Sequence, residues 1–151
     1  MHTASYGRFA AMVTTSTVLG FGAMYLNTYQ LDHVHFSWNR LFMALVMGGL
    51  MTAVMMLFMW RMYPNKRANV LVLGVAALLL LGGVALARTQ ATVGDVDWMK
   101  AMIPHHSIAI LTSERATISD PRVRELADQI IESQRREIAE MKALVQELEG
   151  R

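Results

Sequence analysis

The stretch Asp95-Val-Asp-Trp-Met99-Lys-Ala-Met102-Ile-Pro-His105-His106 sets the character of this chain. Met99, Met102 and His106 fall at i, i+3 and i+7, the spacing that places side chains on one face of an α-helix. Thioethers are soft ligands suited to Cu(I), and imidazole binds copper or zinc. The spacing therefore predicts a helix with two thioethers and one imidazole on a single face, and this face is a candidate site for a soft metal ion.

Three apolar segments precede this stretch, at residues 9–29, 41–60 and 70–87. At roughly 1.5 Å per residue, each approaches the ~30 Å hydrocarbon thickness of a bilayer. We therefore expect residues 1–91 to form a three-span membrane anchor. Aromatic residues near the segment ends resemble an interfacial belt, and they are Tyr25, Tyr29, Trp38, Trp60 and Tyr63.

The composition supports this expectation and excludes several functions. The chain has 151 residues, of which 54% are hydrophobic and 17% are charged, so it is more apolar than an ordinary soluble domain. It has no cysteine, which excludes disulfides, thiolate zinc sites and cysteine nucleophiles. The net charge of +2 is modest, and basic residues alternate with acidic ones near the C-terminus. We therefore expect no nucleic-acid partner.

The basic residues near the segment ends predict the orientation. Four of them would share the N-terminal side of the membrane, and these are Arg8, Arg61, Lys66 and Arg67. Arg40 and Arg88 would lie on the other side. The positive-inside rule then puts the N-terminus in the cytoplasm and the C-terminal domain outside. The predicted location is a bacterial inner (cytoplasmic) membrane with a periplasmic C-terminal domain.

The second apolar segment carries a row of methionines, each four residues from the last, at positions 43, 47, 51, 55 and 59. Methionine is a flexible apolar filler of helix–helix gaps, and a row of thioethers is also a ladder for Cu(I). The loop before this segment holds His33 and His35. A secondary set of candidate metal ligands therefore comprises His33, His35, Met43, Met47 and Met51. Two glycine pairs, Gly48-Gly49 and Gly82-Gly83, predict close helix approach.

Residues 92–151 are expected to form an extramembrane antiparallel helical hairpin. Asp120 is a good N-cap and Pro121 a good first residue for its second helix, which should end near Glu149. Across the hairpin, Met99 is expected to face Met141. His106 is expected to face Gln134, and Met102 is expected to face Glu137 or Ile138. Two helices cannot enclose their own core, so we expect a homo-oligomer, a dimer or larger, or a partner membrane protein.

This segment resembles the bacterial family called Domain of Unknown Function 305, and the three-span anchor resembles a membrane-bound subgroup of it. The matching pattern runs through residues 95–149, and its residues are Asp95, Trp98-Met99, Met102-Ile103, His105-His106, Ala109-Ile110, Gln134, Glu137 and Met141. The resemblance implies a ferritin-like helical fold, so the expected class is all-α, with three transmembrane helices and a half-bundle completed by oligomerisation. It also implies copper or silver binding for some members.

The leading functional hypothesis is a membrane-anchored extracytoplasmic protein that binds Cu(I) or Ag(I), as a chaperone or sink in metal homeostasis or tolerance. The candidate ligands are Met99, Met102, His105, His106 and Met141. Gln134, Glu137 and Asp95 would be the groups that surround and orient them.

Two alternatives stay open. The first is a non-enzymatic accessory subunit that docks on a partner membrane complex. The second is an oligomeric metal transporter that uses the methionine row. No organic cofactor is implied. We expect no enzymatic activity, because no nucleophile or convergent carboxylate pair accompanies the histidines.

Overall fold

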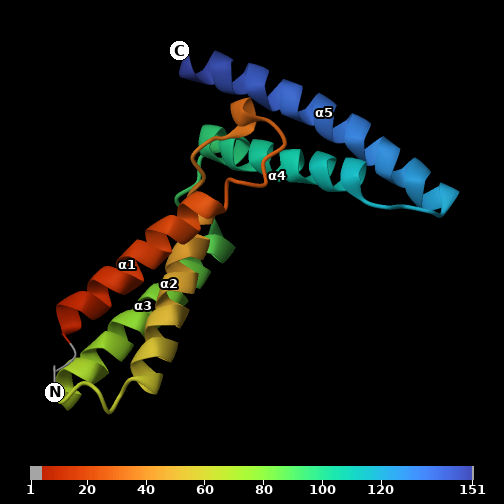
Figure 1. Cartoon of the computed structure of the whole chain (residues 1–151). Coiled ribbons are helices and arrows are strands. Elements are labelled where there is room, and N and C mark those ends of the chain that lie inside the picture. Colours follow the sequence, from red (N-terminus) through yellow and green to blue (C-terminus); the bar gives the residue numbers. More distant parts are fainter. Residues whose placement is uncertain (1–4, 151) are drawn as a thin grey trace. The chain divides into compact units, whose positions relative to one another are not determined.

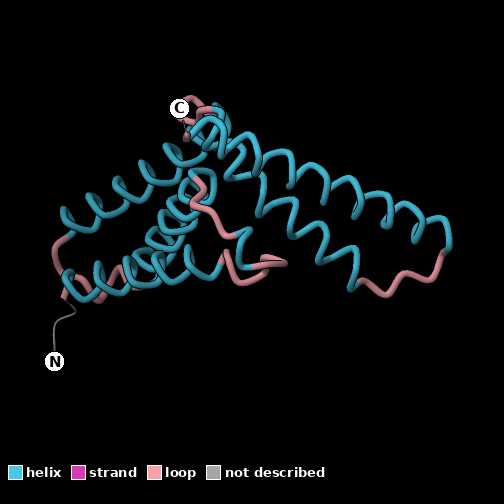
Figure 2. Tube along the Cα trace, turned by 90° about the horizontal axis from the view of Figure 1, so that it is seen from above, coloured by secondary structure: helices cyan, strands magenta, loops and turns pink. Residues whose placement is uncertain are grey.

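The computed structural model describes residues 5–150 and is entirely helical over that range (Figure 1). The elements are α1 (Tyr6–Ala23), the short 3-10 helix η1 (Leu31–His33), α2 (Trp38–Phe58), α3 (Lys66–Thr89), α4 (Asp95–Arg115) and α5 (Pro121–Glu149). Figure 2 shows helices and connecting loops, and no strand, in this described part of the chain. The prediction of an all-α chain is confirmed.

The chain divides into two compact units. One contains α1, most of α2, and α3, from residues 1–24 and 39–92, and we call it the apolar unit. The other combines residues 25–38 with residues 93–151. Because all 12 acidic residues of the chain lie in this second unit, we call it the acidic unit. The segment 25–38, which we expected partly in the first span and partly in the loop after it, thus belongs with α4 and α5.

Two helices of the apolar unit are long and apolar enough to cross a membrane. They are α2 and α3, with mean hydropathies of 2.3 and 2.7. Their apolar windows are only 33% and 11% buried inside the molecule, so most of this apolar surface has no protein cover. By length and composition, these helices are two of the three expected spans.

The first expected span, residues 9–29, is not confirmed by the structure. The helix there is α1, which has 18 residues and ends at Ala23, and it does not reach the apolarity of α2 and α3. Arg8 and the hydroxyl residues at positions 14–17 account for its polarity. Beyond it, the Thr28 hydroxyl donates to the carbonyl oxygen of Tyr25 at 2.9 Å, and both residues belong to the acidic unit.

Glycines allow the helices of the apolar unit to approach closely. A Cβ built on Gly49 would lie 2.7 Å from the carbonyl oxygen of Ala76, and one on Gly83 would lie 2.8 Å from Val46 Cγ2. A Cβ on Gly48 would meet the Thr17 hydroxyl at 2.7 Å, whereas one on Gly82 would meet nothing within 4 Å. The close approach expected at the glycine pairs is therefore confirmed at three positions and is absent at Gly82.

A buried asparagine fastens α1 to the connection between α2 and α3. Asn69 is fully buried and accepts a hydrogen bond from the Tyr6 hydroxyl at 2.7 Å. Its Nδ2 donates to the carbonyl oxygens of Trp60 (3.3 Å) and Tyr63 (3.2 Å). The start of α1 is thus held at the level where α2 ends and α3 begins.

The acidic unit is built on contacts between α4 and α5, which run in opposite directions. Lys100 near the start of α4 pairs with Glu149 at the end of α5, and Glu114 near the end of α4 pairs with Arg135 at 2.6 Å. The buried core between them comprises Met99, Ile103, Ile110, Ile138, Met141 and Val145. Tyr29, from the segment 25–38, packs against the same core.

Candidate functional site

The site helices begin and end at residues that fix their boundaries. Helix α5 starts where Asp120 accepts from the backbone N–H of Arg122 at 2.9 Å, with Pro121 in its first turn, as the sequence predicts. Helix α4 starts after Gly94 and stays helical through Pro104, which is buried. Met99, Met102 and His106 therefore lie on one uninterrupted helix, as the spacing predicts.

His106 is bound at both ring nitrogens. Its Nδ1 lies 3.0 Å from the carbonyl oxygen of Met102, and its Nε2 lies 2.8 Å from Glu137 Oε2. Glu137 also accepts a hydrogen bond from the Ser133 hydroxyl at 2.7 Å. Since a carbonyl oxygen only accepts, Nδ1 carries a proton. The contact of Nε2 with the Glu137 carboxylate joins α4 to α5.

The partner of His106 differs from the one expected, because the register of the two helices is shifted by about one turn. We expected Gln134, and the structure has Glu137. Residues 116–120 lie between the two helices, and Figure 1 shows this connection running on past the end of α4 before the chain reverses. Helix α5 therefore starts farther out, so each residue of α4 meets a later residue of α5.

Hydrogen bonding keeps the Glu137 carboxylate ionised. The Ser133 hydroxyl is the main cause that lowers the pKa of Glu137 below its ordinary value, and His106 adds to it. Hydrogen bonds and a nearby cation both favour the charged form of a carboxyl group. At neutral pH, Glu137 is therefore an anion that holds and orients the His106 ring.

The three methionines expected as ligands belong to one apolar cluster. Met99 and Met141 are 5% and 7% exposed, and Met102 packs against the same cluster. His106 is joined to this group through its bond to the Met102 carbonyl. The structure thus brings three thioethers and one imidazole into the same part of the α4–α5 pair. Thioethers in a cluster of this kind also serve as core packing.

The other expected site residues lie apart from this group or at its edge. His105 is exposed, with its ring centroid 6.4 Å from that of His106. Asp95 is exposed at the start of α4, beside a cavity of about 320 Å³ that Met99 also lines. Within residues 5–150, no group of three or more His, Asp and Glu side chains is placed to hold a metal ion.

A second polar cluster, centred on Ser107, was not expected from the sequence. Ser107 is completely buried. Its Oγ accepts from the backbone N–H of Tyr29 at 2.8 Å and lies 3.0 Å from His33 Nδ1. The sequence signal was available, because Ser107 interrupts an apolar row formed by Ile103 and Ile110 on α4. Ser107 is the residue that anchors the segment 25–38.

His33 is held neutral by its surroundings. Burial is the first cause that lowers the pKa of His33, and the charge of Lys142 adds to it. The Ser107 hydroxyl can accept from the Tyr29 N–H and donate its own proton to an unprotonated Nδ1 of His33. The geometry therefore accommodates the neutral imidazole that the pKa direction favours.

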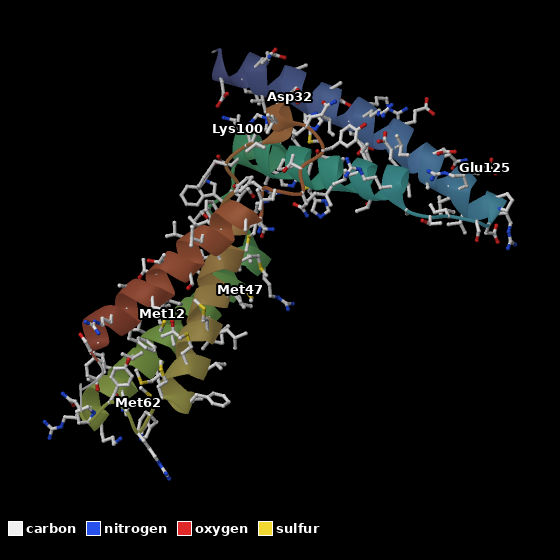
Figure 3. All side chains as sticks on the ribbon, in the orientation of Figure 1. Met12, Asp32, Met47, Met62, Lys100 and Glu125 are labelled. Atoms are coloured by element: carbon white, nitrogen blue, oxygen red, sulfur yellow. The ribbon has the colours of Figure 1, made fainter. Side chains whose placement is uncertain are left out.

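Asp32 and His35 complete the contacts of this segment. Asp32 pairs with Lys142 of α5 at 2.5 Å, which lowers the pKa of Asp32. His35 lines a cavity of about 420 Å³ together with Lys100 and Lys142, and burial is the main cause that lowers its pKa. Figure 3 labels Asp32 and Lys100 near the same end of the acidic unit. Asp32 and Glu149 line the same cavity, and each is paired with one of the two lysines, so the formal charges around it balance.

The order Ser107, His33, Asp32 resembles that of a hydrolytic triad, but its geometry does not support catalysis. The distance from His33 Nε2 to Asp32 Oδ1 is 3.9 Å, too long for a hydrogen bond. Ser107 is 0% exposed, so no substrate carbonyl can reach its hydroxyl. The cluster has the features of a structural anchor.

The first two methionines of the α2 row face outward from the apolar unit, whereas Met55 and Met59 pack against its core. Met43 and Met47 are 42% and 54% exposed, and Met51 is half-buried, whereas Met56, outside the row, is fully buried in the core of this unit. His33 and His35 belong to the acidic unit, so the structure does not bring the secondary set of candidate ligands into one cluster.

Two comparisons with known proteins show the family of the chain. Residues 84–149 match the family described as "Domain of unknown function (DUF305)", so the match contains α4, α5 and the His106 site. The chain is also 31% identical to "Uncharacterized protein L153" of Acanthamoeba polyphaga mimivirus over 144 residues. That similarity covers 91% of this chain and 93% of the viral protein. The chain belongs to the DUF305 family, and no solved structure matches it.

Proposed function

We propose that the protein is a membrane-anchored soft-metal binder that takes Cu(I) or Ag(I) as cargo, serving as a chaperone or a sink in metal homeostasis or tolerance. The observation that carries this proposal is the gathering of Met99, Met102 and Met141 around one buried cluster, with His106 bonded to Met102. Thioether and imidazole groups together form a donor set that suits a soft monovalent ion.

The acidic unit can favour a cation in two ways. All acidic residues of the chain are concentrated there, so its field raises the local concentration of cations. Glu137 has a second partner in Ser133, and it therefore stays hydrogen-bonded when His106 turns Nε2 from the carboxylate to the ion. Glu137 would then be the group that guides the imidazole, and Gln134 and Asp95 would lie farther out.

The anchor is proposed to cross the membrane three times. Most of the apolar surface of α2 and α3 has no protein cover, which suits contact with lipid. Although α1 is more polar, it lies along the pair: Thr17 packs against Gly48, and Tyr6 bonds to Asn69 at the far end of the unit. The threonine hydroxyls of α1 can bond to its own backbone, as Thr17 does to Val13 at 2.8 Å.

Charge then gives the orientation. The bond from Tyr6 to Asn69 brings the N-terminal Arg8 to the end of the apolar unit that carries Arg61, Lys66 and Arg67. We place this end in the cytoplasm by the positive-inside rule, and the acidic unit outside. The proposed location is a bacterial inner membrane with a periplasmic acidic unit.

We further propose that the acidic unit forms a homo-dimer. Several apolar side chains of α5 remain exposed, and they include Val123 (49%), Leu126 (56%) and Leu144 (41%). A second α4–α5 pair would cover such a surface and complete a ferritin-like four-helix bundle.

The test is a titration of the purified full-length protein in detergent with Cu(I), in competition with a chelator of known affinity. We expect Met102→Leu with His106→Ala to abolish the high-affinity step. The matched control is Met12→Leu, on the exposed surface of α1, which should leave it intact. If both variants and the wild type bind equally, these residues are not the site.

A second function is favoured by one observation. Glu137 is hydrogen-bonded to both His106 and Ser133 without a metal ion. A polar layer of this kind can fix the register of two packed helices. The protein would then be an accessory subunit that docks on a partner membrane complex and needs no metal. A stoichiometric partner that co-purifies with metal-free protein, and is lost on Glu137→Ala, would support this alternative.

Metal transport is the third proposal. Since Met43 and Met47 face outward, a thioether path would need several copies of α2 around a pore. Flux of Cu(I) into reconstituted vesicles, lost on substitution of Met47 and Met51 by leucine, is the result that would support it. We propose no enzymatic reaction and no organic cofactor.

A further inference from the structure

The segment that enters α2 has its polar side chains inward and its apolar side chains outward. His33 and Ser37 are 6% and 2% exposed, whereas Val34 (42%) and Phe36 (52%) are exposed. Val34 has an extended backbone, in which successive side chains point to opposite sides. A segment that faced only water would have the opposite arrangement, so its outer side calls for an apolar neighbour.

Hydrogen bonds to the acidic unit fix which side of the segment points inward. His33 is bound to Ser107, and the backbone N–H of Ser37 donates to the Tyr25 hydroxyl at 3.2 Å. With both residues held, the segment cannot rotate to hide Phe36. The fold of the acidic unit therefore keeps the Phe36 side chain exposed.

Two of the outward aromatic rings contact each other. The rings of Phe36 and Trp38 lie 5.3 Å apart at 88°, an edge-to-face contact. Trp38 remains 36% exposed, so this pairing does not remove the cluster from its surroundings. Two of the aromatic residues expected in the interfacial belt lie elsewhere. Tyr29 packs on the core of the acidic unit, and Tyr63 is buried.

The covalent chain limits how far this cluster lies from the apolar span. Trp38 is the first residue of α2, and Phe36 is two residues before it, at most about 7 Å away for an extended chain. The headgroup layer on each side of a bilayer is about 5–8 Å thick. If α2 crosses a membrane, Phe36 is therefore within reach of the headgroup layer, wherever the rest of the acidic unit lies.

We propose that Val34, Phe36 and Trp38 insert into the headgroup region of a phospholipid bilayer and hold the segment 25–38 at the membrane surface. The partner is the lipid surface because the cluster is continuous with α2. Tryptophan also favours the boundary between acyl chains and water, and phenylalanine is common on the buried face of interfacial segments. The proposal rests on the proposed function in one respect, that α2 spans the membrane.

The test measures the depth of single tryptophans in the full-length protein reconstituted into phospholipid vesicles. Trp38, Trp60 and Trp98 are first replaced by phenylalanine, and one probe is then introduced by Phe36→Trp. Two reference probes are Leu50→Trp, in the middle of α2, and Glu125→Trp, exposed on α5. Quenching by lipids brominated near the glycerol is compared with quenching by lipids brominated near the acyl-chain ends.

We expect Phe36→Trp to lose most of its fluorescence with the shallow bromines and little with the deep ones. Leu50→Trp should show the reverse, and Glu125→Trp should respond to neither. If Phe36→Trp responds as weakly as Glu125→Trp while Leu50→Trp is quenched, the cluster does not contact lipid and the inference is overturned. If Leu50→Trp is not quenched, α2 does not span the bilayer, and the membrane anchor itself is wrong.

Discussion

At the scale of single residues, His33 and His106 have different roles. His33 is buried and neutral, and it ties the segment 25–38 to Ser107 of α4. His106 is less buried, and it bridges α4 and α5 through Glu137. The first interaction stabilises the fold, whereas the second fixes the orientation of an imidazole on the same helix pair as the three methionines.

The Ser107 anchor can be tested by removing one oxygen atom. We expect Ser107→Ala to destabilise the acidic unit by about 1–3 kcal/mol, because it leaves the Tyr29 N–H and His33 Nδ1 buried without a partner. Hydrogen exchange of the Tyr29 amide in the full-length protein measures the effect. Ser113→Ala, at a half-buried position of the same helix, is the control and should change exchange little. Equal exchange in both variants would show that Ser107 is not the anchor.

The lowered pKa of His33 predicts how this anchor responds to pH. The unfolded imidazole titrates near its ordinary value of about 6.5, whereas burial lowers the folded value. Between the two values, the unfolded chain binds more protons, so stability is fully present above pH ~6.5 and is lost as pH falls toward the folded pKa. His35 acts in the same direction.

The measurement is the melting temperature of the acidic unit in the full-length protein as a function of pH. His33→Gln should reduce the decrease in melting temperature below pH ~6.5. His105→Gln, at an exposed position, should leave this decrease unchanged. A profile unchanged by His33→Gln would show that other groups cause the fall.

At the scale of elements, the sequence predicts what local pattern controls. The apolarity of α2 and α3, the Asp120 cap and the alignment of Met99 with Met102 and His106 all follow from spacing and residue type. The segment 25–38 could not be placed in this way, because its contact to Ser107 joins residues 74 positions apart. The partner of His106 was missed because the register depends on the path of a five-residue connection, which a pattern does not give.

Packing of α2 on α3 makes a prediction that uses two glycines. We expect Gly49→Ala to lower the stability of the protein in detergent by about 1–3 kcal/mol, because the added methyl group would meet the backbone of α3. Gly82→Ala meets open space and should leave stability equal or slightly higher. The measurement is the thermal unfolding temperature of the two variants. Equal temperatures would mean that α2 and α3 do not pack closely at Gly49.

At the scale of the whole molecule, the arrangement of the two units limits the topology. The segment before α2 and the residues after α3 fold into one acidic unit. They must therefore lie on the same side of any membrane that α2 and α3 cross. Two crossings return the chain to the side from which it started, so the division into units is consistent with the proposed spans.

The orientation can be measured by labelling introduced thiols, because the chain has no native cysteine. We expect Glu125→Cys, on α5, to react with a membrane-impermeant maleimide in spheroplasts. Met62→Cys, in the connection between α2 and α3 (Figure 3), should react only after the membrane is permeabilised. The opposite result for both sites would invert the proposed orientation, and labelling of both from outside would argue against two crossings.

The central claim is that the methionines and His106 of the α4–α5 pair bind a soft metal ion. X-ray absorption at the copper edge of the Cu(I)-loaded full-length protein tests it most directly, because it identifies the atoms bound to the metal. The account predicts sulfur neighbours together with a single imidazole nitrogen, and loss of the sulfur signal when Met99, Met102 and Met141 are replaced by leucine. A spectrum with only nitrogen or oxygen neighbours in the wild type would contradict the account.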